Sequence, residues 1–306
     1  MWIDLRKALP YQFACLRNIY FTCIPLQSIL KYDLFCRCIC GKSQNTQRIV
    51  CPNGNANCEV SIGSIPWQVG LVSRRKFQPW CGGTLINDRY VLTAAHCVKK
   101  LKPFMLDAII GDVDWTTRRE TLELRRQVTE IHVHPKFGKT ATFDHDFAIL
   151  KLHNPIEFHL NDHIRPVCLP FYDQPNALAG QIGKVTGWGV VDPKAPSIQA
   201  NKLQQVTVKI LESGECMRSY PVSSVTKSMF CARGNNSDSC YGDSGGPFTI
   251  NRRGVSVLEG VISWGKNCAR PEWPGVYSRV GYVLDWIRDH TKDSYSCWKD
   301  AIDTFL

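Results

Sequence analysis

The sequence predicts an all-β protein that ends in a short helix. Apolar runs at 68–72, 90–92 and 260–264 are rich in branched residues and are separated by Gly, Pro, Asn and Asp, a pattern typical of strands joined by turns. Residues 282–287 instead have helical spacing. The chain has 306 residues, 44% of them hydrophobic, so it is long enough to bury a sizeable core.

A serine in a glycine-rich turn is the strongest chemical signal in the chain. Residues 242–247 read Gly-Asp-Ser-Gly-Gly-Pro. A serine hydroxyl is a weak nucleophile until a neighbouring base takes its proton, and the oxyanion that forms needs hydrogen-bond donors held ready for it. The glycines allow the close backbone approach that this chemistry requires. Ser244 is therefore a candidate nucleophile.

A base and a carboxylate precede this serine. His96 ends an apolar run, and Asp144 and Asp146 lie just before the apolar residues 147–150. Histidine, aspartate and serine in this chain order form one of the known triad arrangements. Alone, a serine between glycines is usually a turn, and a histidine after an apolar run is more often a core or cap residue. The three together favour nucleophilic catalysis.

These segments resemble the trypsin-like serine proteases of the chymotrypsin fold, over about residues 49–290. The resemblance implies two packed six-stranded antiparallel β-barrels followed by a C-terminal helix. It also implies a division of the chain into an N-terminal segment or propeptide at 1–48, a protease domain at 49–292 and a tail at 293–306. The implied activity is hydrolysis of peptide bonds by a serine endopeptidase.

The resemblance assigns a role to each candidate residue. Ser244 attacks the carbonyl, His96 moves its proton, and the carboxylate holds the imidazole. The family pattern places this carboxylate directly before the apolar run, which selects Asp146 over Asp144. The backbone amides of Gly242 and Ser244 are expected to form the oxyanion hole, where one donor is worth about 3 to 4 kcal/mol of barrier.

A competing hypothesis is the G-x-S-x-G nucleophile elbow of α/β-hydrolases, which residues 242–246 also match. In that fold an acid and then a histidine follow the serine. Only His290 follows Ser244, and no strand-elbow-helix pattern surrounds the serine. The trypsin-like arrangement is therefore favoured.

The resemblance places Asp238 at the floor of the primary specificity pocket. A buried carboxylate is costly unless a cation pairs with it, so the pocket is expected to select Arg or Lys. Tyr241 and Asn267 depart from common family residues at the rim and could narrow the range of substrates. The other substrate-binding residues implied by the resemblance are Ser239, Tyr241, Ser263, Trp264, Gly265 and Gly275.

Fifteen cysteines indicate an oxidising compartment. The expected localisation is secreted and extracellular, although the N-terminal segment contains no convincing signal peptidase site. Pairing cannot be deduced from cysteine counting, and the partners of seven cysteines stay open. The pairs implied by the resemblance are Cys81 with Cys97, Cys216 with Cys231, Cys240 with Cys268, and Cys40 with Cys168.

Activation is expected at Arg48-Ile49, which resembles a zymogen cleavage site. The new ammonium group of Ile49 would insert and pair with Asp243, which would order the oxyanion hole and the pocket. The chain continues with Cys51-Pro52 where the family usually has two glycines, and Pro52 restricts the backbone there. An alternative function is therefore a protease-like binding module that is catalytically inactive because N-terminal activation fails.

No cofactor is required by the proposed chemistry, and no metal site is expected. Clustered cysteines at 36–40 and the histidines at 132 and 134 lack the second ligand pair that structural zinc favours. Calcium is a weaker alternative to a solvated acidic loop. The acidic residues concerned are Asp112, Asp114, Glu120 and Glu123.

The expected partners are protein or peptide substrates with Arg or Lys at the cleaved bond, together with protein inhibitors. No apolar run of the N-terminal segment reaches the length of a membrane span, and no pattern indicates nucleic-acid binding. The net charge of +10 could attract acidic glycans through basic runs at 74–76, 99–100 and 118–119, although such runs are usually solvated loops.

Overall fold

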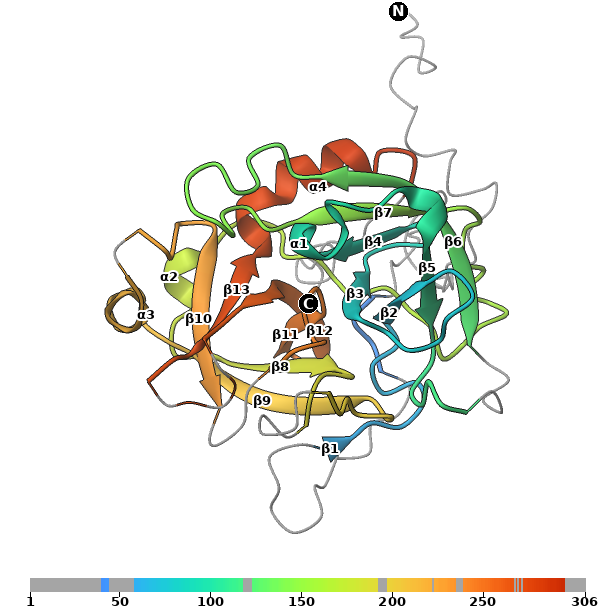
Figure 1. The fold of residues 1–306 in the computed structure, drawn as a ribbon, viewed down its shortest axis with the longest axis horizontal. Helices are drawn as coiled ribbons and strands as arrows, with labels where there is room; N and C mark the ends of the chain where they lie inside the picture. The colour runs from blue at the N-terminus through green and yellow to red at the C-terminus, as the bar shows by residue number, and fades with distance from the viewer. Residues whose placement is uncertain are drawn as a thin grey trace, which may run out of the picture.

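Strands dominate the part of the chain that the computed structural model describes, which is residues 40–43, 58–117, 123–191, 197–221, 223–234, 239–266, 268, 270 and 272–294. Two β-barrels lie side by side, with the first at the right of Figure 1 and the second at the left. No helix in the described ranges has both the length and the apolar character needed to cross a membrane. The expected all-β class is confirmed.

The first barrel is a closed antiparallel sheet in the order β2-β3-β4-β7-β6-β5. Its interior is one cluster of buried apolar side chains, because branched residues alternate inward along short strands. Its strands are β2 (Gln68–Ser73), β3 (Cys81–Leu85), β4 (Tyr90–Thr93), β5 (Leu106–Ile110), β6 (Leu124–Val133) and β7 (Ala148–Leu152).

The second barrel runs in the order β9-β10-β13-β12-β11-β8 and is closed by pairing of β8 with β9. β1 (Cys58–Glu59) pairs with the start of β9. The two six-stranded barrels are those that the resemblance implies. The remaining strands are β8 (Ile182–Gly187), β9 (Gln204–Ile210), β10 (Met229–Gly234), β11 (Pro247–Arg252), β12 (Val255–Trp264) and β13 (Gly275–Arg279).

The helices are short. The helix expected at 282–287 is α4 (Leu284–His290), and a 3₁₀ turn, η5 (Val280–Val283), precedes it. Both elements bury apolar side chains in the core of the first barrel, so the chain end of the second barrel covers the first. The other helices are α1 (Ala95–Val98), η4 (Pro103–Met105), α2 (Pro175–Leu178) and α3 (Ser213–Ser219).

Four disulfides brace the described part of the chain. Cys81–Cys97 joins β3 to α1, and Cys240–Cys268 joins the loop before the candidate nucleophile to the loop after β12. Cys216–Cys231 and Cys40–Cys168 complete the set. All four are pairs that the resemblance implies, and disulfides of this kind fit an oxidising environment.

The two barrels are joined by direct hydrogen bonds. The Thr186 hydroxyl of β8 donates to Gln68 Oε1 of β2 at 2.5 Å, and both residues are buried. The backbone N–H of Gly82 in β3 donates to the carbonyl oxygen of Ser244 at 2.7 Å. The candidate nucleophile is thereby fixed against the first barrel.

Candidate active site

The first barrel positions the candidate base and its carboxylate. His96 lies in α1, directly after β4, and Asp146 lies just before β7. Because β4 pairs with β7, the two residues come together, and His96 Nδ1 lies 2.6 Å from Asp146 Oδ2. The backbone N–H of His96 also donates to Asp146 Oδ1 at 2.8 Å. This bonding selects the tautomer in which Nε2 is left as the proton acceptor.

The carboxylate of Asp146 is fully buried and receives a third hydrogen bond from the second barrel. The hydroxyl of Ser263, in β12, donates to Asp146 Oδ2 at 2.6 Å. Three donors compensate a carboxylate that has lost its water. From the sequence Ser263 is expected only as a substrate-binding residue, since no spacing signal links residues 117 positions apart.

Asp144 has a separate structural function. Its Oδ1 atom accepts hydrogen bonds from the hydroxyls of Thr226 at 2.6 Å and Ser228 at 2.8 Å, and its Oδ2 atom lies 3.0 Å from His145 Nδ1. Burial raises the pKa of Asp144, but the hydrogen bonds from these three residues outweigh it and hold the pKa below its usual value. Asp144 thus ties the loop before Asp146 to the second barrel.

Histidine packing supports the same loop. His145, which takes a left-handed φ of 51°, stacks on His134 with ring centroids 4.7 Å apart, and His134 contacts Trp286 of α4 edge-on at 4.8 Å. Burial, together with the electrostatic effects of the neighbouring His145 and Lys136 side chains, lowers the pKa of His134 to about 4. His134 is therefore neutral at physiological pH and packs as an aromatic side chain.

The second barrel presents Ser244 on the loop between β10 and β11. The Sγ atom of Cys97 lies 3.6 Å from the Ser244 carbonyl oxygen and 3.7 Å from His96 Nε2, so one sulfur contacts both residues. Among the described residues no hydrogen bond joins the Ser244 hydroxyl to the imidazole. Nucleophile–base bonds often tighten only when substrate binds.

The backbone around Ser244 leaves two amides available. Neither the Gly242 N–H nor the Ser244 N–H donates a backbone hydrogen bond within the described ranges. Gly242 has φ of 96° and Gly245 has φ of 82°. A Cβ on Gly245 would collide with Thr93 Oγ1, so this position needs glycine for both conformation and space.

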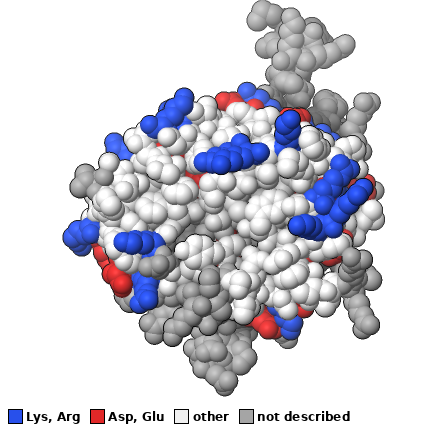
Figure 2. Space-filling view, viewed as in Figure 1, with Lys and Arg blue, Asp and Glu red and all other residues white. Residues whose placement is uncertain are grey.

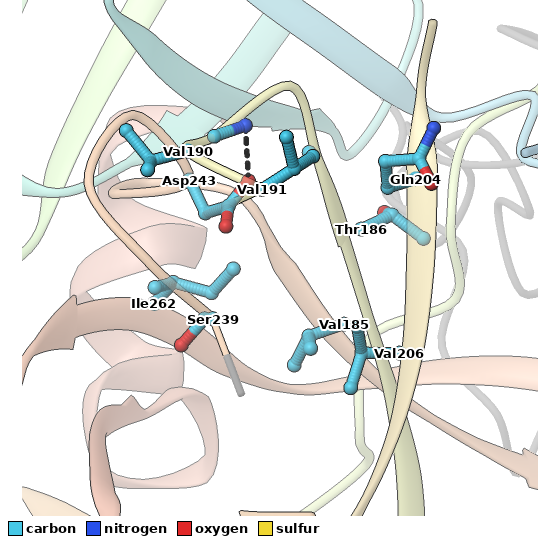
Figure 3. Close-up of a pocket in the computed structure, with 11 residues that line it drawn as sticks. Val185, Thr186, Val190, Val191, Gln204, Val206, Ser239, Asp243 and Ile262 are labelled. Carbon is cyan, nitrogen blue, oxygen red and sulfur yellow. Dashed lines mark hydrogen bonds between the residues drawn. The ribbon is translucent and has the colours of Figure 1, made fainter. Parts of the chain in front are cut away.

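Asp243 points away from this turn into a pocket of about 330 Å³, part of it open to solvent. Figure 3 shows its carboxylate facing apolar side chains of β8, β9 and β12, namely Val185, Val206 and Ile262. The backbone N–H groups of Gly189 and Cys240 each donate to it at 2.8 Å. Desolvation nevertheless raises the pKa of Asp243 to about 6, because no cation among the described residues compensates the charge.

Aromatic side chains form one side of the predicted substrate-binding region. Phe143 meets His96 edge-on with ring centroids 5.6 Å apart and stacks on Trp264, at the end of β12, at 5.9 Å. Tyr220 also packs edge-on against Trp264, with ring centroids 4.7 Å apart. Trp264 is thus fixed between two rings beside the candidate base.

The structure describes some of the remaining residues predicted for the pocket but not all of them. The Ser239 hydroxyl lies 3.2 Å from the buried Tyr277 hydroxyl of β13, and Gly275 begins the same strand. Gly265 and Tyr241 are exposed, and the carbonyl of Tyr241 accepts a hydrogen bond from Val190. Four residues predicted for the pocket or for activation lie outside the described residues: Arg48, Ile49, Asp238 and Asn267.

Potential metal-ligating side chains gather at the disulfide beside the candidate base. Among the described residues the one group of three or more is Cys81, His96 and Cys97, and its two cysteines are bonded to each other. In the acidic loop, Asp112 Oδ1 accepts a hydrogen bond from the Asp114 N–H, and Asp114 Oδ1 accepts two from Thr116. These carboxylates are buried and stabilise their own turn; Glu120 lies outside the described residues.

A family model described as Trypsin matches residues 56–287, which is most of the chain and includes both barrels. The chain belongs to the trypsin family. The resemblance inferred from three short motifs is thus confirmed by a match over the whole fold. This trypsin-family domain is a protein-cleaving hydrolase of the serine protease type, and its disulfides fit an extracellular protein.

Proposed function

We propose that this trypsin-family protein is a secreted serine endopeptidase that cleaves after Arg or Lys through Ser244, His96 and Asp146. The observation that carries the proposal is the His96–Asp146 pair, in which the buried carboxylate bonds the Nδ1 atom of a partly exposed imidazole that the Cys81–Cys97 disulfide braces next to Ser244. An imidazole whose Nδ1–H is held by a carboxylate has its Nε2 atom free to act as general base.

The reaction follows from these positions. Ser244 Oγ attacks the scissile carbonyl while His96 Nε2 takes its proton, and the Asp146 carboxylate stabilises the imidazolium that forms. The imidazolium then gives the proton to the leaving amine, which leaves an ester between Ser244 and the acyl part of the substrate. Water repeats the sequence, with His96 as its base, and releases the acid.

Charge on the carbonyl oxygen is stabilised by the chain itself. The N–H groups of Gly242 and Ser244 are available as donors, and loss of one such donor typically costs about 3 to 4 kcal/mol of barrier. Because nucleophile, base and oxyanion donors all come from the protein, the proposed reaction requires no metal or cofactor.

Selectivity for Arg or Lys is proposed to come from Asp238. This residue lies outside the described ranges but directly precedes Ser239, whose hydroxyl reaches Tyr277 inside the second barrel. A carboxylate beside Ser239 would pair with a guanidinium or ammonium group of the substrate. Protein inhibitors that present Arg or Lys would use the same pairing.

Activation is proposed to follow cleavage between Arg48 and Ile49. The pocket at Asp243 supports this step, because valine and isoleucine side chains line part of it and its carboxylate has amide partners but no cation among the described residues. An isoleucine with a free α-ammonium group offers matching chemistry: a branched apolar side chain and a positive charge. Pairing would remove the desolvation penalty of Asp243 and order the turn that carries Ser244.

The test is hydrolysis of fluorogenic peptides ending in Arg, Lys or Phe, before and after cleavage at Arg48, with the Ser244→Ala protein as control. We expect activity on Arg and Lys peptides that depends on cleavage and is absent from the control. An Asp238→Ser variant should lose the preference for basic residues but keep its reactivity toward a small serine-directed reagent. Folded, cleaved protein without activity would identify the domain as the inactive binding module.

A further inference from the structure

One surface of the first barrel combines exposed cations with exposed apolar side chains. It is formed by the turn after β2 and by η4, and we call it the basic-apolar surface. Its residues are Arg74, Arg75, Lys76, Lys102, Phe104 and Met105, all of them exposed. Figure 2 shows Lys and Arg side chains gathered on the right of the molecule, the side on which Figure 1 places the first barrel.

The fold fixes the two parts of this surface next to each other. Ser73 pairs with Leu106 at the end of the β2–β5 ladder, and the Arg74 N–H donates to the Met105 carbonyl oxygen at 3.2 Å. Arg75 takes a left-handed φ of 69°, which is uncommon for a residue with a side chain, at the tip of the turn. The backbone therefore holds these side chains together on a defined frame.

The charges of the basic-apolar surface are not compensated locally. None of Arg74, Arg75, Lys76 and Lys102 forms an ion pair among the described residues, whereas neighbouring Arg125 pairs with Asp107 at 2.8 Å. Uncompensated cations on one surface attract an acidic partner.

The apolar side chains distinguish between acidic partners. Phe104 is 58% exposed and Met105 is 44% exposed, both on a single 3₁₀ turn between the cations. A sulfated glycan would pair with the cations but has no large apolar groups to cover these two. A polypeptide that alternates acidic and large apolar residues complements both.

Short segments of the chain link the basic-apolar surface to the site. The segment that carries Lys102 follows α1, which holds His96, and the turn that carries Lys76 leads into Gly82, which donates to the Ser244 carbonyl. A chain bound between the barrels could therefore continue onto this surface. We propose that it docks a segment of the protein substrate that is rich in acidic and large apolar residues, an inference that rests on the proposed endopeptidase function.

Docking is tested first without catalysis. The Ser244→Ala protein is titrated into a fluorescein-labelled peptide in which Asp and Glu alternate with Phe and Leu, and binding is followed by fluorescence anisotropy. We expect saturable binding that weakens about tenfold in Arg74→Glu with Lys102→Glu, and about tenfold in Phe104→Ser with Met105→Ser. Lys227→Glu and Leu160→Ser, which change an exposed cation and an exposed apolar residue elsewhere, are the matched controls and should leave binding unchanged.

The link to substrate is tested in the active protein with two quenched peptides that share one Arg cleavage site. One of them continues after that site with the acidic and apolar segment. We expect this extension to lower KM by about tenfold in the unaltered protein and to have no effect in the two surface variants, while kinetics on the short peptide stay unchanged.

Specific outcomes would overturn the proposal. Equal binding by all variants would show that the basic-apolar surface does not bind the peptide. Binding that a heparin fragment displaces, and that Phe104→Ser with Met105→Ser does not weaken, would show that the surface binds glycans instead. Binding without any effect on KM would exclude the substrate as the docked chain. If neither quenched peptide is cleaved, the proposed function fails, and the anisotropy measurement still decides whether the surface binds the acidic and apolar peptide.

Discussion

Two carboxylates, one associated with each barrel, are stabilised in different ways. Asp146, beside the first barrel, accepts hydrogen bonds from the His96 ring, the His96 backbone and Ser263. Asp243, in the second barrel, accepts only two backbone hydrogen bonds among the described residues, and burial raises its pKa to about 6. The pair that holds the base is complete once the chain folds, whereas the carboxylate behind the nucleophile still lacks a cation.

The apolar cores of the two barrels also differ, since the core of the first barrel is more continuous than that of the second. The first barrel has one continuous apolar core, which extends into η5 and α4. The second barrel divides its buried side chains between an interior cluster and a second cluster around Cys216–Cys231 and Tyr220. The proposed activation, in which a new chain end pairs with Asp243, is more easily accommodated in the half with the divided core, because smaller cooperative units can rearrange separately.

The largest expected effect comes from disrupting the hydrogen bonds of Asp146 beside the first barrel. In Asp146→Asn an amide NH₂ group would face the Nδ1 atom of His96 or the hydroxyl of Ser263, both of which now donate to the carboxylate. The imidazole would then be held in the wrong tautomer, and kcat on an Arg peptide should fall about ten-thousandfold. Steady-state kinetics of the cleaved protein measure this.

The control for this prediction is a measurement of whether the variant is folded. Thermal unfolding monitored by circular dichroism should show that Asp146→Asn is folded at the assay temperature. A variant that is folded and retains more than about a tenth of the kcat would contradict the role proposed for Asp146.

The second prediction concerns Asp243 and follows from the link between its pKa and the pH dependence of folding stability. The pKa of Asp243 is about 6 in the folded protein against 3.8 as its ordinary value, so between these pH values the folded state holds a proton that the unfolded chain releases. The stability of the uncleaved protein should therefore decrease as pH rises from about 4 to about 6, by about 2 kcal/mol from this group. Urea unfolding at pH 4.5 and pH 7 measures the change.

Cleavage should reverse this behaviour. An ammonium group next to Asp243 would lower its pKa, so the cleaved protein would lose the decrease in stability. The comparison uses the Ser244→Ala background to prevent self-digestion, with Arg48→Gln as the uncleavable form. Identical pH dependence in cleaved and uncleaved protein would contradict pairing between Ile49 and Asp243.

The third prediction separates the two aspartates of one loop. Asp144→Asn should lower the stability by about 1 to 3 kcal/mol, because Thr226, Ser228 and His145 lose a charged partner in a buried position. Its kcat, measured well below the unfolding temperature, should stay within about threefold of the unaltered protein. A loss of kcat comparable to that of Asp146→Asn would show that the orienting carboxylate had been assigned to the wrong residue.

The sequence predicts the fold class and the four described disulfides because each rests on local motifs of a known family. The choice of Asp146 over Asp144 likewise needed only the apolar run that follows it. The partners of both aspartates lie far along the chain, at Ser263, Thr226 and Ser228. Such contacts depend on how the barrels pack, which no local pattern encodes.

The pocket at Asp243 shows the same limit. Asp243 stands in the serine motif, but the apolar side chains that line part of its pocket, Val185, Val206 and Ile262, come from three different strands. The expected helix at 282–287 begins instead at Leu284, because the preceding residues form a 3₁₀ turn packed on the first barrel. Tertiary packing, rather than residue spacing, sets such boundaries.

The smallest expected effect concerns the aromatic contact that crosses between the halves. Phe143 contacts both His96 and Trp264, and we expect its ring to limit the room for the substrate residue that precedes the cleaved Arg or Lys. Phe143→Ala should raise kcat/KM for peptides with Leu or Phe at that position by about tenfold relative to peptides with Gly. Fluorogenic peptides that differ only at this position provide the measurement.

Phe143→Leu is the matched control, because it keeps an apolar side chain of intermediate size and should give an intermediate ratio. The ratio of the two kcat/KM values distinguishes a wall of the binding site from a support for the base. If kcat/KM falls by the same factor for all peptides, Phe143 acts by holding the His96 ring edge-on, and the contact supports the His96–Asp146 pair. A change confined to peptides with large residues would show that Phe143 forms a wall of the substrate-binding site together with Trp264.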